Sequence, residues 1–321
     1  MSEKPFFSVV IPVYNKGPHI QRSISSVLNQ TFQDFEVILV NDASTDNSLE
    51  EIQKSTDPRI RILHRDEPGP GGYAARNLGI KEARAEWVAF LDADDEWYEE
   101  HLERMSLLSQ KYPNINFMSC GYIWQTKQFD KVDNYFVKNK EKGPHVISAC
   151  EYLSNCLSDS RPVNTDVACV RSSSPILPSL FPAEEKAKRG GDLHAWLKMM
   201  CRHKKMAWSD HIGAVYFQDS VNMVTKTAPS SPCLMSSKIY RELSGGLNAE
   251  EAKLLRKYLN MRLKAAWIDN LKRGNKNFGL PQRLYWQGDM TNALELSFLA
   301  LSPTFLLKSA MALKALRRNN A

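Results

Sequence analysis

Residues 91–95 (LDADD) place three carboxylates directly after an apolar run, residues 87–91. Asp92 and Asp94 are separated by one residue and can share a hard divalent cation, which takes oxygen ligands and keeps other positions for water or phosphate oxygens. An isolated DxD pattern is about as typical of an acidic loop before a helix. The cluster therefore indicates a metal site only in combination with other motifs.

Polar residues follow other apolar runs as well. Residues 6–14 form a β-branched and aromatic run that ends near Asn15, and residues 35–40 lead into Asp42. Ligands of open α/β sheets bind outside the carboxyl ends of parallel strands. We therefore expect Tyr14, Asp42 and the acidic cluster to share one rim of a sheet.

The elements that would position these residues alternate between strands and helices, which favours a doubly wound α/β sheet. Asp46 is predicted to cap the second helix. The predicted strands are 6–14, 35–40, 59–63, 87–91 and 116–124, and the predicted helices are 19–30, 47–54, 73–85 and 97–112.

Four sequence blocks occur in a specific order: SVVIPVYN, VNDASTDNS, GGYAARNLGI and FLDADD. In order and spacing they resemble inverting family 2 glycosyltransferases with the GT-A fold, closely over residues 6–125 and more loosely to about 225. The resemblance implies a doubly wound mixed sheet of GT-A type, flanked by helices. It also implies transfer of a sugar from a nucleoside diphosphate sugar, with a UDP-sugar favoured, to a hydroxyl group with inversion at the anomeric carbon.

The same resemblance implies roles for individual residues. Tyr14 would stack on the uracil ring, Asp42 would accept a hydrogen bond from the base N3–H, and Arg76 would organise the carboxylates or the diphosphate. Asp92 would contact the ribose or a metal-bound water, and Asp94 would bind Mg²⁺ or Mn²⁺. The alternative interpretation of Tyr14 is a core residue at a strand end, and that of Arg76 is a solvated helix residue. The implied donor-binding residues are Pro12, Val13, Tyr14, Asn15, Asp42, Arg76, Asp92 and Ala93.

A general base is expected on the opposite side of the sugar, in the segment 181–200. Asp192 is the predicted base: the glycines at 190–191 would allow close approach to a ligand, and Trp196 follows at the spacing seen in the family. Many relatives have a Glu before this Asp, where the present chain has Gly191. The alternative interpretation of Asp192 is a plain helix N-cap.

Weaker predictions surround this segment. Glu184 and Glu185 are alternative bases. Gln218 stands where relatives often place an Arg or His that reaches the diphosphate, so this contact is absent or supplied elsewhere, with His211 as a candidate. The remaining predictions are a helix cap at Asp95, and acceptor contacts or structural roles at His194 and at residues 164–166.

Charge divides the chain into two regions. Residues 234–321 contain 15 Lys+Arg against 6 Asp+Glu, whereas the preceding 233 residues are slightly acidic. A nucleic-acid binder would carry its basic surface on the main domain, so this class is excluded. We predict a nucleotide-sugar-binding and catalytic domain over 1–226, a linker at 227–233 and a helical C-terminal region over 234–321.

The C-terminal region is predicted to contain helices near 234–244, 249–273, 289–301 and 304–318. An amphipathic stripe with basic residues at 304–318 suggests that this appendage rests on the cytoplasmic membrane surface, towards a glycan or polyprenyl-linked acceptor. Packing on the catalytic domain or a homo-oligomer is the equal alternative.

Signals for export or membrane insertion are weak. The N-terminus meets Pro12 too soon for a secretory signal, and the apolar stretch 294–307 is interrupted by Glu295 and shorter than the ~20 residues of a spanning helix. The six Cys form no CxxC pair, which argues against a zinc site and against disulfides. We expect a cytoplasmic protein with reduced thiols.

Two other functions remain open from the sequence. A haloacid dehalogenase-type phosphatase also has a DxD after an apolar strand, but its motif normally opens the fold and continues into a Thr-bearing stretch, which DADDEW lacks. A non-catalytic nucleotide-sugar binding module is the second alternative.

Overall fold

The computed structural model describes residues 4–274, 279–287 and 289–301. The chain divides into two compact units, Met1–Ala228 and Pro229–Ala321. The division falls within the predicted linker, residues 227–233. Each unit is described by itself.

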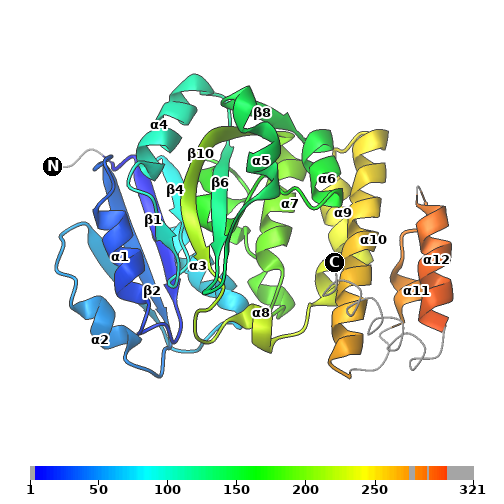
Figure 1. The fold of residues 1–321 in the computed structure, drawn as a ribbon, viewed down its shortest axis with the longest axis horizontal. Helices are drawn as coiled ribbons and strands as arrows, with labels where there is room; N and C mark the ends of the chain where they lie inside the picture. Colours follow the sequence, from blue (N-terminus) through cyan, green and yellow to red (C-terminus); the bar gives the residue numbers. More distant parts are fainter. Residues whose placement is uncertain (1–3, 275–278, 288, 302–321) are drawn as a thin grey trace. The chain divides into compact units, whose positions relative to one another are not determined.

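A mixed sheet forms the centre of the first unit (Figure 1), with the strand order β3-β2-β1-β4-β9-β6-β10-β5. The first four strands are parallel, β9 is antiparallel to both of its neighbours, and β10 is parallel to β6. These strands are β1 (Phe7–Val13), β2 (Phe35–Asp42), β3 (Ile60–Arg65), β4 (Trp87–Phe90), β5 (Glu96–Trp97), β6 (Phe117–Gln125), β9 (Cys169–Arg171) and β10 (Lys205–Phe217). Two short strands, β7 (Asp130–Val132) and β8 (His145–Ser148), pair with β6 and β10 respectively.

Helices cover both faces of this sheet. Alternate residues of a strand point to opposite faces, and Val9 of β1 belongs to the core with Ile24 and Met105, on one face. On the other face, a Cβ at Gly79 would lie 2.4 Å from Val10, so only glycine lets α3 pack this closely on β1. The helices of the first unit are α1 (Ile20–Leu28), α2 (Ser48–Gln53), α3 (Tyr73–Glu82), α4 (His101–Lys111), α5 (Asn134–Asn139), α6 (Ala149–Leu157), α7 (Gly191–His203) and α8 (Val224–Thr227).

The predicted helix at 97–112 begins later than expected. Glu96 and Trp97 form β5, which pairs with β10, and α4 begins only at His101 with Glu100 as its N-cap. Asp95 does not cap this helix: its Oδ1 accepts a hydrogen bond from the backbone N–H of Phe217, 2.7 Å away. The prediction of a helix cap at Asp95 is therefore wrong, because a strand pairing occupies the connection.

The second unit is helical where the structure describes it. Its helices are α9 (Ser237–Ser244), α10 (Ala249–Lys272), α11 (Leu280–Arg283) and α12 (Met290–Leu301). A capping box of Asn248 and Glu251 begins α10, and Asn260 in its middle donates to Asp289. The predicted helix at 304–318 lies outside the described residues. Across the described part of the chain, every helix is too short or too polar to cross a membrane.

Candidate active site

The carboxyl ends of β1, β2 and β4 meet at one edge of the sheet, and the predicted site residues lie there. Lys16, in the turn after β1, forms an ion pair of 2.6 Å with Asp94, in the turn after β4. The Lys16 ammonium also donates to the Val221 carbonyl oxygen at 2.7 Å. Three distant segments of the sequence thus converge on this rim.

Arg76 of α3 is buried and pairs with Asp92. Its guanidinium also donates to the Gly71 carbonyl oxygen at 3.1 Å. Burial alone lowers the pKa of Arg76, but the carboxylate of Asp92 outweighs it and raises the pKa above its usual value. Arg76 is therefore a fixed cation that holds Asp92, and the interpretation of a solvated helix residue is wrong.

Asp92, Asp95 and Asp166 form a carboxylate cluster, with one oxygen of each within 4.8 Å of the others. Asp166 Oδ1 accepts from the Asp92 backbone N–H at 2.9 Å. The Oδ2 atoms of Asp95 and Asp166 are buried and receive no hydrogen bond from the described residues. Burial, together with the neighbouring carboxylates, raises the pKa of both Asp95 and Asp166 well above the usual value.

This cluster fits a divalent cation. Mg²⁺ and Mn²⁺ prefer oxygen ligands, and buried carboxylate oxygens without a donor carry a desolvation cost that a cation would offset. Asp166 was predicted to touch the acceptor, and this is wrong: its side chain is only 1% exposed, behind the DxD segment. The sequence offered no signal that would pair Asp166 with Asp95.

Asp94, the predicted metal ligand, is not one of these three residues. Its carboxylate is held by Lys16, whose side chain is only 13% exposed. The sequence analysis missed Lys16, although it directly follows the Tyr14-Asn15 pair at the end of the first strand. In this arrangement the rim combines two cationic side chains, Lys16 and Arg76, with four carboxylates.

The residues predicted to recognise the base lie at the ends of β1 and β2. Asp42 is buried; it pairs with Arg65 and accepts from the Gly69 N–H at 3.1 Å. Burial raises the pKa of Asp42, and the Arg65 charge opposes this shift. Tyr14 is 43% exposed. The interpretation of Tyr14 as a core residue is therefore wrong, and its ring is free to stack on a ligand.

The other predicted donor-binding residues at these strand ends differ in which of their groups can contact a ligand. Asn15 has a left-handed backbone with φ of 52°, and its Oδ1 accepts from the Thr45 N–H at 2.8 Å. Val13 and Ala93 point into the hydrophobic core, so only their backbone groups can face a ligand. Pro12 is half-buried in β1.

Asp192 lies in the first turn of α7 and is half-buried. The N-cap is Gly190, with φ of 87°, and no side chain caps this helix. The interpretation of Asp192 as an N-cap is therefore wrong. Its charge helps to raise the pKa of Tyr73 and of Arg76. Asp192 therefore acts electrostatically on α3, although more than 100 residues separate it from that helix.

Gly191 is required by a protein contact. A Cβ at this position would lie 2.5 Å from the Tyr73 ring, and the Gly191 N–H donates to the Tyr73 hydroxyl at 2.8 Å. The glycine was expected to give room to a ligand, but it gives room to Tyr73. This contact fixes the start of α7 against the start of α3, and so positions Asp192.

The weaker candidates have other surroundings. Glu184 and Glu185 lie in a short 3₁₀ turn, Ala183–Glu185. The Gln218 N–H donates to the Gln125 carbonyl oxygen at 2.9 Å. His211 contacts His101 and Ser209 rather than residues of the rim. His194 is buried within α7, which favours its structural interpretation.

The family model and the relatives that match this chain are described as glycosyltransferases. Residues 8–155 match the family model described as Glycosyl transferase family 2. The chain is 34% identical over 149 residues to the Escherichia coli UDP-Glc:alpha-D-GlcNAc-diphosphoundecaprenol beta-1,3-glucosyltransferase WfgD, covering 46% of this chain and 55% of WfgD. It is 32% identical over 208 residues to an uncharacterized glycosyltransferase of Rickettsia bellii, covering 61% of this chain and 26% of that protein. The chain thus spans between about a quarter and just over half of these relatives.

Solved structures show the fold. Staphylococcus aureus TarS 1–349 in complex with UDP-GlcNAc superposes with a TM-score of 0.71 at 19% identity, covering 87% of this chain and 78% of that one. The mannosyltransferase PcManGT from Pyrobaculum calidifontis, in complex with GDP-Man and Mn²⁺, gives a TM-score of 0.55 at 18% identity, covering 98% and 81%. The predicted GT-A type mixed sheet flanked by helices, with C-terminal helices, is confirmed.

Proposed function

We propose that the protein transfers a sugar from a nucleoside diphosphate sugar to a hydroxyl group, with inversion at the anomeric carbon, because residues 8–155 match the family model of glycosyl transferase family 2. The observation that carries the proposal is the contact of Gly191 with Tyr73, because it fixes Asp192 beside the start of α3, the helix whose Arg76 holds Asp92. A single displacement needs a base and a leaving group on opposite sides of one sugar.

We propose a UDP-sugar as the donor. The exposed Tyr14 ring would stack on uracil, and the buried carboxylate of Asp42, held by Arg65, would accept from N3–H. The likeness to a TarS structure that contains UDP-GlcNAc supports this choice. In the proposed complex of this chain with its donor, the nucleotide would be lined by Asn15 and by the backbones of Pro12, Val13 and Ala93.

The chain's own residues would carry the reaction as follows. Asp192 takes the proton of the acceptor hydroxyl. Arg76 holds Asp92 in place for the ribose, and Lys16 brings a positive charge to the rim where the diphosphate leaves. Asp94 would hold Mg²⁺ or Mn²⁺ together with the carboxylate cluster. Such a cation, when bound, offsets the charge that develops on the leaving diphosphate.

The acceptor is proposed to be a glycan or a polyprenyl-linked sugar, within polysaccharide synthesis. The relative WfgD, whose printed name gives a diphosphoundecaprenol acceptor, supports this class. Residues 1–226 would bind the donor and catalyse transfer, and residues 234–321 would contact the acceptor, a membrane surface or a second copy of the chain.

A panel of nucleoside diphosphate sugars tests the proposed function. Incubation with Mn²⁺ or Mg²⁺ should release the nucleoside diphosphate slowly from one donor, measured by a coupled assay, and the other donors should serve as controls. A UDP-sugar is expected to react. Tight binding by calorimetry without turnover, in the presence of candidate glycan and lipid-linked acceptors, would instead identify a binding module.

The second unit is proposed to rest on an anionic membrane surface. Met290, Leu294, Phe298 and Leu301 are exposed on α12 at spacings that put them on one helix face. The full chain should therefore co-sediment with anionic liposomes, and added salt should weaken this binding, because each basic residue contributes about 1 kcal/mol near such a surface.

Leu294→Asp gives the matched variant for this experiment, with Leu107→Asp on the exposed side of α4 as its control. The first should reduce sedimentation and the second should not. If the full chain ignores anionic liposomes even at low salt, residues 234–321 do not bind membrane.

A further inference from the structure

A second group of metal-ligand side chains lies apart from the carboxylate rim. His101 begins α4, Cys120 lies in the middle of β6, and His211 lies in β10. One ligand atom from each lies within 4.8 Å of the others. The His101 Nδ1 atom is 3.4 Å from His211 Nε2 and 3.7 Å from Cys120 Sγ.

The backbone around this group is irregular. β10 leaves its regular register with β6 between Ser209 and Ile212, and again between Ile212 and Ala214. Bulges of this kind redirect side chains, and His211 lies within this one. At Gly213, a Cβ would lie 2.2 Å from His101 Nδ1 and 2.6 Å from Cys120 Sγ. The space shared by the two side chains therefore exists only because residue 213 is glycine.

The two separations from His101 Nδ1 match those around a tetrahedral ion. With metal–nitrogen bonds of about 2.0–2.1 Å and metal–sulfur bonds of about 2.3 Å, a tetrahedral angle puts two nitrogens about 3.3 Å apart and a nitrogen and a sulfur about 3.6 Å apart. The observed separations of 3.4 and 3.7 Å lie close to both values. A cation could therefore enter with small movements of these side chains.

We propose that His101, Cys120 and His211 bind a thiolate-preferring d¹⁰ cation, Zn²⁺ or Cu⁺, that joins α4 to β6 and β10. Zn²⁺ and Cu⁺ prefer imidazole and thiolate ligands, whereas Mg²⁺ prefers oxygen ligands. Three protein ligands suffice for Cu⁺, and Zn²⁺ would add a water as its fourth ligand. The proposed role of the ion is structural. It would hold the start of α4, which follows the DxD segment, against β6 and β10.

The protonation states of the two imidazoles agree with this assignment. Burial lowers the pKa of His101, and it lowers the pKa of His211 to about 3, so both rings are neutral and keep a lone pair for a metal. Burial raises the pKa of the Cys120 thiol. Binding would therefore release the Cys120 proton to solvent as the sulfur–metal bond forms.

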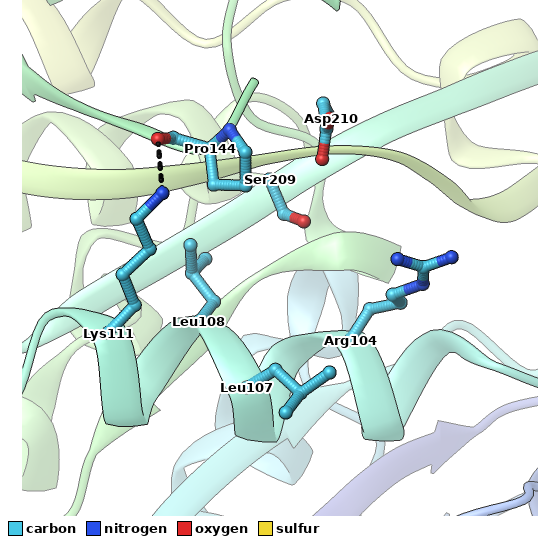
Figure 2. Close-up of a pocket in the computed structure, with 7 residues that line it drawn as sticks. All are labelled: Arg104, Leu107, Leu108, Lys111, Pro144, Ser209 and Asp210. Atoms are coloured by element: carbon cyan, nitrogen blue, oxygen red, sulfur yellow. Dashed lines mark hydrogen bonds between the residues drawn. The ribbon is translucent and has the colours of Figure 1, made fainter.

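Ser209 connects this group to the surface. Its hydroxyl contacts His211 Nδ1 at 2.9 Å, the kind of outer contact that orients a ligating imidazole. Ser209 also lines a surface pocket of about 140 Å³ between α4 and β10, with Arg104 and Lys111 on its helix side (Figure 2).

Metal content and a Co²⁺ titration test the proposal on the full-length chain. As purified, the protein should contain close to one Zn or Cu per chain. After removal of metal, Co²⁺ added in excess Mg²⁺ should produce a thiolate-to-cobalt absorption band that saturates near one equivalent. Excess Mg²⁺ would fill the carboxylate cluster, and none of its three members is a cysteine, so this signal is independent of the glycosyltransferase proposal. Displacement of Co²⁺ by Zn²⁺, or by Cu⁺ under reducing conditions, identifies the preferred ion.

Variants locate the site. Cys120→Ala should abolish the band, whereas Cys169→Ala, at another buried cysteine in the neighbouring strand β9, should retain it. Ser209→Ala should weaken Co²⁺ binding by about 10- to 100-fold. If Cys120→Ala does not fold, His211→Gln at the partly exposed bulge provides the same test by loss of affinity.

Two results would overturn the proposal. The first is wild-type protein that contains no Zn or Cu and produces no thiolate band with Co²⁺. The second is a band of unchanged strength in Cys120→Ala, or an unchanged Co²⁺ affinity in His211→Gln. Either would mean that the three side chains form a hydrogen-bonded part of the core and bind no metal.

Discussion

Replacement of Asp192 by Asn should reduce sugar transfer by about 10²–10⁴, the usual contribution of a general base. UDP affinity should stay within a few-fold of wild type, because Asp192 is expected to contact the acceptor rather than the nucleotide. The amide has nearly the same shape as the carboxylate, and no side chain caps α7, so the helix should remain intact. Calorimetry with UDP and a transfer assay with the donor that the panel identifies measure the two quantities.

The two alternative bases provide matched controls for this experiment. Glu184→Gln and Glu185→Gln remove carboxylates from the same segment, in the 3₁₀ turn before α7, and should leave transfer nearly unchanged. Near-normal transfer by Asp192→Asn, together with a large loss in either Glu variant, would move the general base to that glutamate. A large loss of UDP affinity in Asp192→Asn would mean that Asp192 acts in donor binding.

Replacement of Asp94 by Asn should reduce metal-dependent donor turnover by at least about 10²-fold, since a catalytic cation contributes several kcal/mol of charge stabilisation. The fold should survive, because Asp94 lies in a turn after β4 and its loss removes one ion pair, with Lys16. Turnover measured across Mn²⁺ concentrations would show whether the variant needs more metal. Activity that persists in wild type with excess chelator would contradict the metal assignment.

Lys16 supplies the control that separates two roles of Asp94. If Asp94 serves mainly to position the Lys16 ammonium, Lys16→Met should reproduce the loss seen in Asp94→Asn without changing the dependence on Mn²⁺. If Asp94 binds the cation, the two variants should differ: only Asp94→Asn should require more Mn²⁺. The 2.6 Å contact makes these two residues the informative pair to compare.

The sequence by itself determined the first half of the sheet. β1, β2 and β4 are nearly continuous apolar runs, as expected of parallel strands covered on both faces, and their buried residues follow that pattern. The polar residues at their ends could be placed on one rim, because parallel strands must end at the same edge. Asp192 was predicted as the general base from the resemblance to the family.

Only the tertiary structure decided which side chains meet. Lys16 pairs with Asp94 across 78 residues, and Asp166 joins Asp95 because β9 inserts antiparallel between β4 and β6. The cysteine spacing argued against a metal site, yet the bulge in β10 brings His211 to Cys120 and His101. A local sequence pattern reflects the side-chain periodicity and the burial of a single helix or strand. A cluster depends on strand order, bulges and close packing at a glycine, which are decided by contacts between segments far apart in the chain.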